Sequence, residues 1–147
     1  MSDLYELQLA WELGDALPGE VLDDLRWHLG LLQDIGPLGD DVDECGPLLA
    51  ARGPASRIGG FLSGELTQGQ RGWSVTLRQE VHAEELPELD ELLNGVAPYA
   101  PESGPVGHLR FHEDEVPDLL AVQSGVVVRQ PLHPAGSELV PFLEGLA

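Results

Sequence analysis

Four stretches of the chain alternate between apolar and polar residues. Side chains two residues apart on a β-strand share a face, so this alternation is typical of a strand that buries one face and exposes the other. The sequence therefore predicts four strands, at residues 4–12, 56–67, 72–82 and 106–112. Weaker signals at 116–120 and 125–129 predict a further short element and either a fifth strand or a β-extension.

Two other stretches repeat apolar residues at steps of three and four, which is the spacing of one face of a helix. They predict helices at residues 21–32 and 84–96. A further apolar group at 137–147 predicts a short helix there. Between the first helix and the second strand, residues 33–54 are rich in glycine, proline and aspartate, and we expect a long loop.

The order of these elements is β-α-β-β-α-β followed by C-terminal β/α additions. This order predicts an α+β fold of the ferredoxin-like type, in which both helices lie on one face of a single antiparallel sheet. In that fold the fourth strand pairs with the first, and the first pairs with the third. The 147 residues fall within the usual size of one domain, so we expect residues 1–147 to form a single domain.

The apolar parity of the strands and the apolar stripes of the helices define an expected core between the sheet and the two helices. Its predicted members are Leu7, Leu9, Trp11, Leu25, Leu29, Leu62, Val75, Leu77, Leu89, Leu93, Leu109 and Phe111.

The opposite parity of three strands collects charged residues and histidines. Cations are scarce, because the chain has no lysine, seven arginines and five histidines, and this parity takes two arginines and three histidines. The polar parity is therefore our candidate ligand site. Its members are Glu6, Arg78, Glu80, His82, His108, Arg110 and His112.

Two chemical functions are open to these side chains. In the expected sheet order His82 and His112 flank Glu6, and two histidines with a carboxylate can bind iron or zinc. Arg78 and Arg110 could instead hold a carboxylate or a phosphate, because a guanidinium group binds such anions through two hydrogen bonds. Cross-strand pairs of glutamate with arginine or histidine also stabilise ordinary solvated sheets, and we favour that interpretation in both cases.

The net charge limits the partners that the protein can have. With 26 acidic and seven basic residues the formal charge is −19, which argues against nucleic acids and anionic membranes. A large partner would be neutral or basic, or would be a second copy of the chain. Cys45 is the only cysteine, and no secretory signal or membrane-spanning segment is evident, so we expect a cytoplasmic protein.

The sequence contains no motif that identifies an enzyme. It lacks a GxSxG turn, a phosphate-binding glycine loop and a short-spaced histidine motif, and it predicts no cofactor. We therefore expect a non-enzymatic binding or accessory module that acts through a protein partner or by self-association, with a homodimer predicted. The alternative is a small-molecule-binding enzyme of the dimeric α+β barrel type, with a pocket of histidines and arginines on the sheet face.

Overall fold

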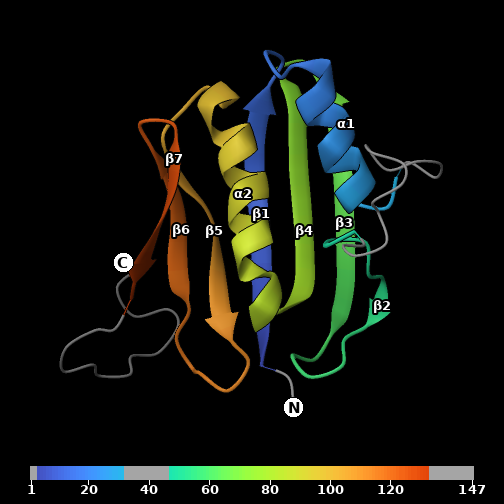
Figure 1. Ribbon diagram of the computed structural model, residues 1–147, viewed down its shortest axis with the longest axis vertical. Coiled ribbons are helices and arrows are strands. Elements are labelled where there is room, and N and C mark those ends of the chain that lie inside the picture. Colours follow the sequence, from blue (N-terminus) through green and yellow to red (C-terminus); the bar gives the residue numbers. More distant parts are fainter. Residues whose placement is uncertain (1–2, 32–46, 133–147) are drawn as a thin grey trace, which may run out of the picture.

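A computed structural model describes residues 3–31 and 47–132 of the chain (Figure 1). Its strands are β1 (Leu4–Gly14), β2 (Gly53–Pro54), β3 (Phe61–Gly69), β4 (Gly72–His82), β5 (Gly104–Phe111), β6 (Asp118–Gln123) and β7 (Val126–Pro131). The helices are α1 (Gly19–His28) and α2 (Leu86–Val96), with the 3-10 turns η2 (Ala83–Glu85) and η3 (Ala97–Tyr99) around α2. None of the helices in these ranges is long and apolar enough to span a bilayer.

The strands form one antiparallel sheet in the order β2-β3-β4-β1-β5-β6-β7, and both helices cover the same face (Figure 1). The α+β class and the pairings of the first strand with β4 and β5 are confirmed. The ferredoxin-like topology is not matched, because the sheet has seven strands. The weak signals after residue 115 are both strands, and they extend the sheet beyond β5 as a hairpin.

The observed strand boundaries agree closely with the predicted ones where the apolar–polar alternation is strong. β4 spans 72–82 as predicted, whereas β3 begins at Phe61 instead of residue 56. The late start has a local cause, because Gly59 and Gly60 adopt positive φ angles of 80° and 70°, which take the chain out of the extended conformation. The predicted helix at 137–147 and residues 32–46 of the expected loop lie outside the described ranges.

The core lies between the sheet and the helices, as the apolar parities predict. All of the predicted core residues are buried except Phe111, which is half-buried and packs against Tyr5 with ring centroids 5.4 Å apart. Leu13, Leu49 and Val81 also belong to this cluster, each at 0% exposure. The helices therefore seal one face of the sheet and leave the other as the candidate location of a site.

One glycine sets how closely β1 and β5 approach. A Cβ atom at Gly107 would overlap the carbonyl oxygen of Gln8 on the neighbouring strand, so no other residue fits without moving a strand. The register between β5 and β6 shifts between Pro105 and Gly107, which is a β-bulge.

Candidate functional site

The face of the sheet opposite the helices, called the open face here, carries the polar parity. Glu6 lies across from Glu80 on β4 and from Arg110 on β5. Gln8 lies across from Arg78 and His108 in the next polar row. The three central strands thus bring polar residues that are far apart in the sequence onto one surface.

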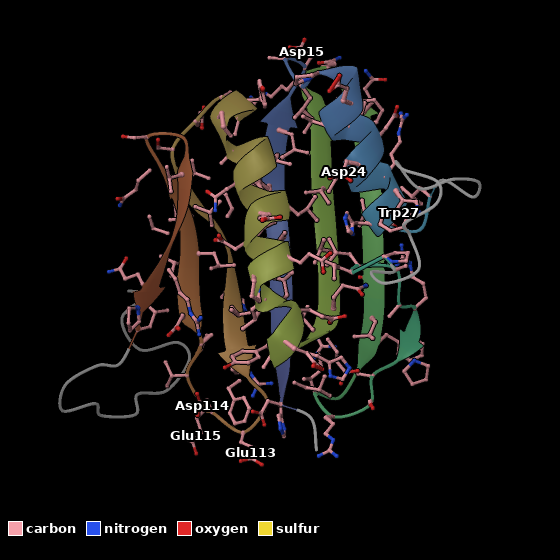
Figure 2. All side chains as sticks on the ribbon, in the orientation of Figure 1. Asp15, Asp24, Trp27, Glu113, Asp114 and Glu115 are labelled. Carbon is pink, nitrogen blue, oxygen red and sulfur yellow. The ribbon has the colours of Figure 1, made fainter. Side chains whose placement is uncertain are left out.

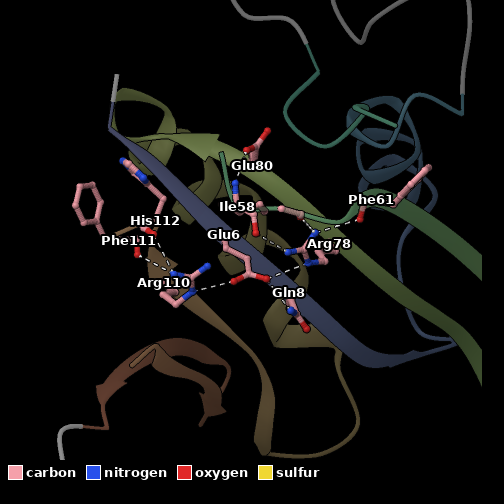
Figure 3. Close-up of polar contacts among 10 residues, drawn as sticks. Glu6, Gln8, Ile58, Phe61, Arg78, Glu80, Arg110, Phe111 and His112 are labelled. Carbon is pink, nitrogen blue, oxygen red and sulfur yellow. Dashed lines mark hydrogen bonds and ion pairs between the residues drawn. The ribbon is translucent and has the colours of Figure 1, made fainter. Parts of the chain in front are cut away.

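Glu6 is the centre of the polar network on this face (Figure 3). Glu6 is 6% exposed, and each carboxylate oxygen accepts a hydrogen bond from an arginine Nε atom at 3.0 Å, from Arg78 on one side and Arg110 on the other. Gln8 donates a further bond at 2.8 Å. Burial alone would raise the pKa of Glu6, but these bonds and the two positive charges outweigh it and hold the pKa below its ordinary value.

Both guanidinium groups also bind backbone carbonyl groups. Arg78 donates to the carbonyl oxygens of Gly59 at 2.7 Å and of Phe61 at 3.2 Å. Arg110 donates to the carbonyl oxygens of His112 at 3.1 Å and of Asp114 at 2.8 Å. Each arginine therefore joins the buried carboxylate to a loop beside the sheet, and these contacts compete with the anion-binding role considered above.

Glu80 holds the segment before β3 against the open face. Its carboxylate accepts hydrogen bonds from the consecutive backbone N–H groups of Ser56 at 2.9 Å, Arg57 at 2.6 Å and Ile58 at 3.1 Å. Burial would raise the pKa of Glu80, but the three amide donors and the charge of Arg78 lower it. This carboxylate stabilises a loop through backbone donors.

The three histidines of the predicted site do not gather around Glu6. His82 lies across from Leu4 at the end of β4, where its backbone N–H donates a hydrogen bond to the carboxylate of Glu85 at 3.0 Å. His112 follows β5, and its N–H bonds to the carbonyl oxygen of Leu4 at 2.9 Å. The metal interpretation requires His82 and His112 to approach Glu6, but the strand register places Arg110 directly across from Glu6. Within residues 3–31 and 47–132 no group of three His, Cys, Asp or Glu side chains is arranged to hold a metal ion.

A hollow of about 510 Å³ occupies the open face beside this network. Its floor consists of short side chains, and Ala10, Ser63 and Thr76 are all exposed. Of the predicted site residues, Arg78 and His108 line it. Other residues that line it are Gln8, Pro105, Val106 and Leu119.

Sequence reasoning missed most of the residues that shape this hollow. It sought charged and metal-binding side chains, whereas the hollow exists because alanine, serine and threonine stand where longer polar side chains would fill the space. The signal was present in the alternation, as Ala10 and Thr76 share the polar parity with Glu6 and Arg78. What the sequence lacks is the register that sets Ala10 directly opposite Thr76.

Other polar residues not predicted as important bind the chain that precedes β2. Gln79 is fully buried and bonds both to Ala51 and to the carbonyl oxygen of Ser63. Arg52 donates to the carbonyl oxygens of Leu29 at 2.7 Å and Gly64 at 3.0 Å. These side chains tie the segment after α1 to β3 and β4.

Comparison of the chain with protein-family models, curated proteins and solved structures finds no match. The chemistry of the site therefore rests on its geometry. The open face offers a shallow surface with hydroxyl, amide and imidazole groups, together with arginines whose charge is largely balanced by Glu6 and Glu80.

Proposed function

We propose that this protein is a non-enzymatic binding module that holds a protein partner against the open face of its sheet. The observation that carries the proposal is the hollow of about 510 Å³, which is floored by short exposed side chains. A concave surface of this kind accepts a protruding side chain or loop of a partner, and such complementary pockets contribute most of the affinity at protein interfaces.

The carboxylates of the open face are already hydrogen-bonded within the protein, which supports binding over catalysis. Glu6, the most buried carboxylate of the face, already accepts three hydrogen bonds. Glu80 accepts bonds from three backbone amides. A general base needs a lone pair that can reach a substrate proton, and these two carboxylates use theirs to hold the fold.

The charge around the hollow indicates the kind of partner. Glu65 on β3 lies in the same cross-strand row as Thr76 and Ala10, and Glu12 lies one polar row further along β1. Both glutamates are exposed. With a net charge of −19 on the whole chain, the face favours a neutral or basic partner in the cytoplasm.

A bulky cation on the hollow floor tests the proposal. Thr76→Arg fills the hollow and raises the net charge by one. Glu91→Gln raises the net charge by the same amount by removing a carboxylate on α2, on the opposite face of the sheet. Partner proteins captured from an extract of the source cells by the parent should be retained by Glu91→Gln and weakened about tenfold or more by Thr76→Arg. Equal capture by the parent and both variants, at equal unfolding midpoints, would contradict the proposal.

A second candidate function rests on His108. This imidazole lines the hollow together with Arg78, so the hollow could hold a small acidic or oxygen-rich molecule with His108 as an acid or base. A second copy of the chain packed on the open face would close such a pocket, as in a dimeric α+β barrel enzyme. A set of small carboxylic acids that raises the melting temperature of the parent and of His112→Asn, but not of His108→Asn, would favour this candidate over the binding module.

A further inference from the structure

The last strand of the sheet has one edge that pairs with no strand among the described residues. β6 and β7 are joined by Ser124 and Gly125, whose φ angles of 53° and 78° are those of a type I′ turn. In such a hairpin the two residues that flank the turn bond to each other, and bonding then alternates along the strands. Val127 and Arg129 consequently direct their backbone N–H and C=O groups away from β6.

Helix α2 lies beside this edge of β7 (Figure 1). The Oδ1 atom of Asn94 accepts a hydrogen bond from the N–H of Val127 at 2.8 Å, which agrees with the bonding parity of the hairpin. Two residues further along β7, the backbone N–H of Arg129 has no acceptor within residues 3–31 and 47–132. The edge is therefore capped by a side chain at one position and open at the next.

An apolar groove accompanies the open part of the edge, and we call it the α2–β7 groove. It has a volume of about 110 Å³ and is lined mainly by Leu89, Leu93, Leu109, Leu120, Val127 and Arg129. An apolar cavity of roughly 150 Å³ accommodates benzene, so this groove has room for about one apolar side chain. A strand edge beside an apolar groove is the arrangement that binds extended peptides by β-strand addition.

The occupant that best fits the groove is the chain itself. The described part ends at Leu132, immediately after β7, with that leucine 40% exposed. The next residues, His133-Pro134-Ala135-Gly136, favour a turn, and the segment that follows contains Leu139, Val140, Phe142 and Leu143. A chain that reverses after Leu132 reaches the groove within a few residues. A strand here is the alternative to the short helix that the apolar pattern of residues 137–147 predicts, and Pro141 disfavours that helix but is tolerated in an edge strand.

We propose that residues 137–143 bind in the α2–β7 groove as an added antiparallel strand. Their backbone pairs with that of Arg129, and one of their apolar side chains fills the space between Leu89 and Leu120. This contact uses the edge of the sheet and the helix side, so it is independent of the function proposed for the open face.

Amide hydrogen exchange of the full chain, followed residue by residue by NMR, tests the proposal. The N–H of Arg129 should exchange at least about tenfold more slowly than an exposed edge amide. The double variant Leu139→Asp/Leu143→Asp should lose this protection, while Ser137→Asp/Gly145→Asp, which adds the same two charges, should keep it. The N–H of Val127 provides the internal reference, because Asn94 protects it in every variant.

Two results would overturn the proposal. One is an unprotected Arg129 amide in the parent, or equal protection in the parent and in Leu139→Asp/Leu143→Asp. The other is protection that disappears when the protein is diluted and its sedimentation changes from a dimer to a monomer, since the occupant would then be a segment of a second copy. Protection that is independent of concentration and sensitive only to the apolar substitutions supports binding within one chain.

Discussion

Individual polar side chains of this protein act mainly by holding backbone segments in place. Glu80 binds three consecutive amides, Arg78 binds three carbonyl groups, and Gln79 bonds to Ala51 and Ser63. A buried backbone group that lacks a partner costs about 1–3 kcal/mol, so this penalty bears on the part-buried bonds of Gln79. Several bonds of Glu80 and Arg78 are exposed, and they hold the loop in place of contacts with water. Arg78 and Glu80, which the sequence places in the candidate ligand site, thus bind backbone groups of the loop before β3.

Glu6 provides the sharpest test of this function. Glu6→Gln removes the charge that lies between Arg78 and Arg110, and we expect a loss of roughly 2–3 kcal/mol, below the range for fully buried ion pairs because both arginines are partly exposed. Glu12→Gln on the same strand and face is the control, with an expected change within about 0.5 kcal/mol. Urea unfolding measures both, and equal midpoints would show that the network contributes nothing to stability.

The folded state also responds to pH through His28. Its Nδ1 atom accepts a hydrogen bond from the N–H of Leu48 at 3.2 Å, so the ring is neutral when the bond is made. Burial lowers the pKa of His28, and the nearby carboxylates of Asp24 and Glu88 oppose the shift without cancelling it. The unfolded chain therefore binds this proton more readily than the folded chain.

The pH dependence that follows has a definite sign. The stability contributed by neutral His28 is fully present above the unfolded pKa of about 6.5 and decreases as the pH falls below it. His28→Asn keeps an acceptor for Leu48 but cannot titrate, so its urea midpoint should fall less than that of the parent between about pH 7.5 and 5.5. His112→Asn is the matched control and should follow the parent. Parallel curves for all three proteins would rule out His28 as the titrating group.

At the scale of elements, β4 connects the two sides of the protein. Val75, Leu77 and Val81 face the helices at 3% exposure or less, while Arg78 and Glu80 face the loop before β3. The strand pairs with β1 on one side and β3 on the other. A change on its apolar side should therefore affect the whole domain.

Leu77→Ala tests this expectation. Removing a buried leucine side chain costs about 2–5 kcal/mol, because the lost apolar contact adds to the cavity that remains. The control Thr76→Ala, one residue earlier on the exposed side, should change the free energy of unfolding by less than about 0.5 kcal/mol. A denaturant midpoint for Leu77→Ala equal to that of the parent would contradict the burial of this side of β4.

The surface of the whole molecule is strongly acidic. Asp15 lies in the turn between β1 and α1, Asp24 lies on α1, and Glu113, Asp114 and Glu115 follow β5 in an acidic turn (Figure 2). The predicted homodimer rested partly on an unpaired edge at the strand of residues 106–112, and that reason is wrong because β6 covers the edge. The remaining basis for a dimer is the open face with its hollow.

Assembly can be measured directly. A second copy on the open face would bury the hollow, so sedimentation at high micromolar concentration should return a dimer mass that Thr76→Arg reduces to the monomer. A monomer mass for the parent over the whole concentration range would exclude the homodimer and leave a different protein as the partner of the open face.

Much of this fold can be predicted from the sequence, since alternation and helical spacing are local properties of the chain. The pleat sends neighbouring side chains to opposite faces, so Leu77 and Arg78 are assigned to opposite sides without knowledge of any partner strand. The α+β class, both helices and almost all of the core follow from such patterns.

Tertiary structure alone decided how the polar residues meet. Glu6 and Arg110 are separated by 104 residues, and their contact depends on a strand register that no local pattern specifies. A different register would bring other side chains to Glu6, so the sequence could place the candidates on one face but could not distinguish a metal site from an ion-paired network. The hollow arises for the same reason, because it requires Ala10, Thr76 and Ser63 to be neighbours across three strands.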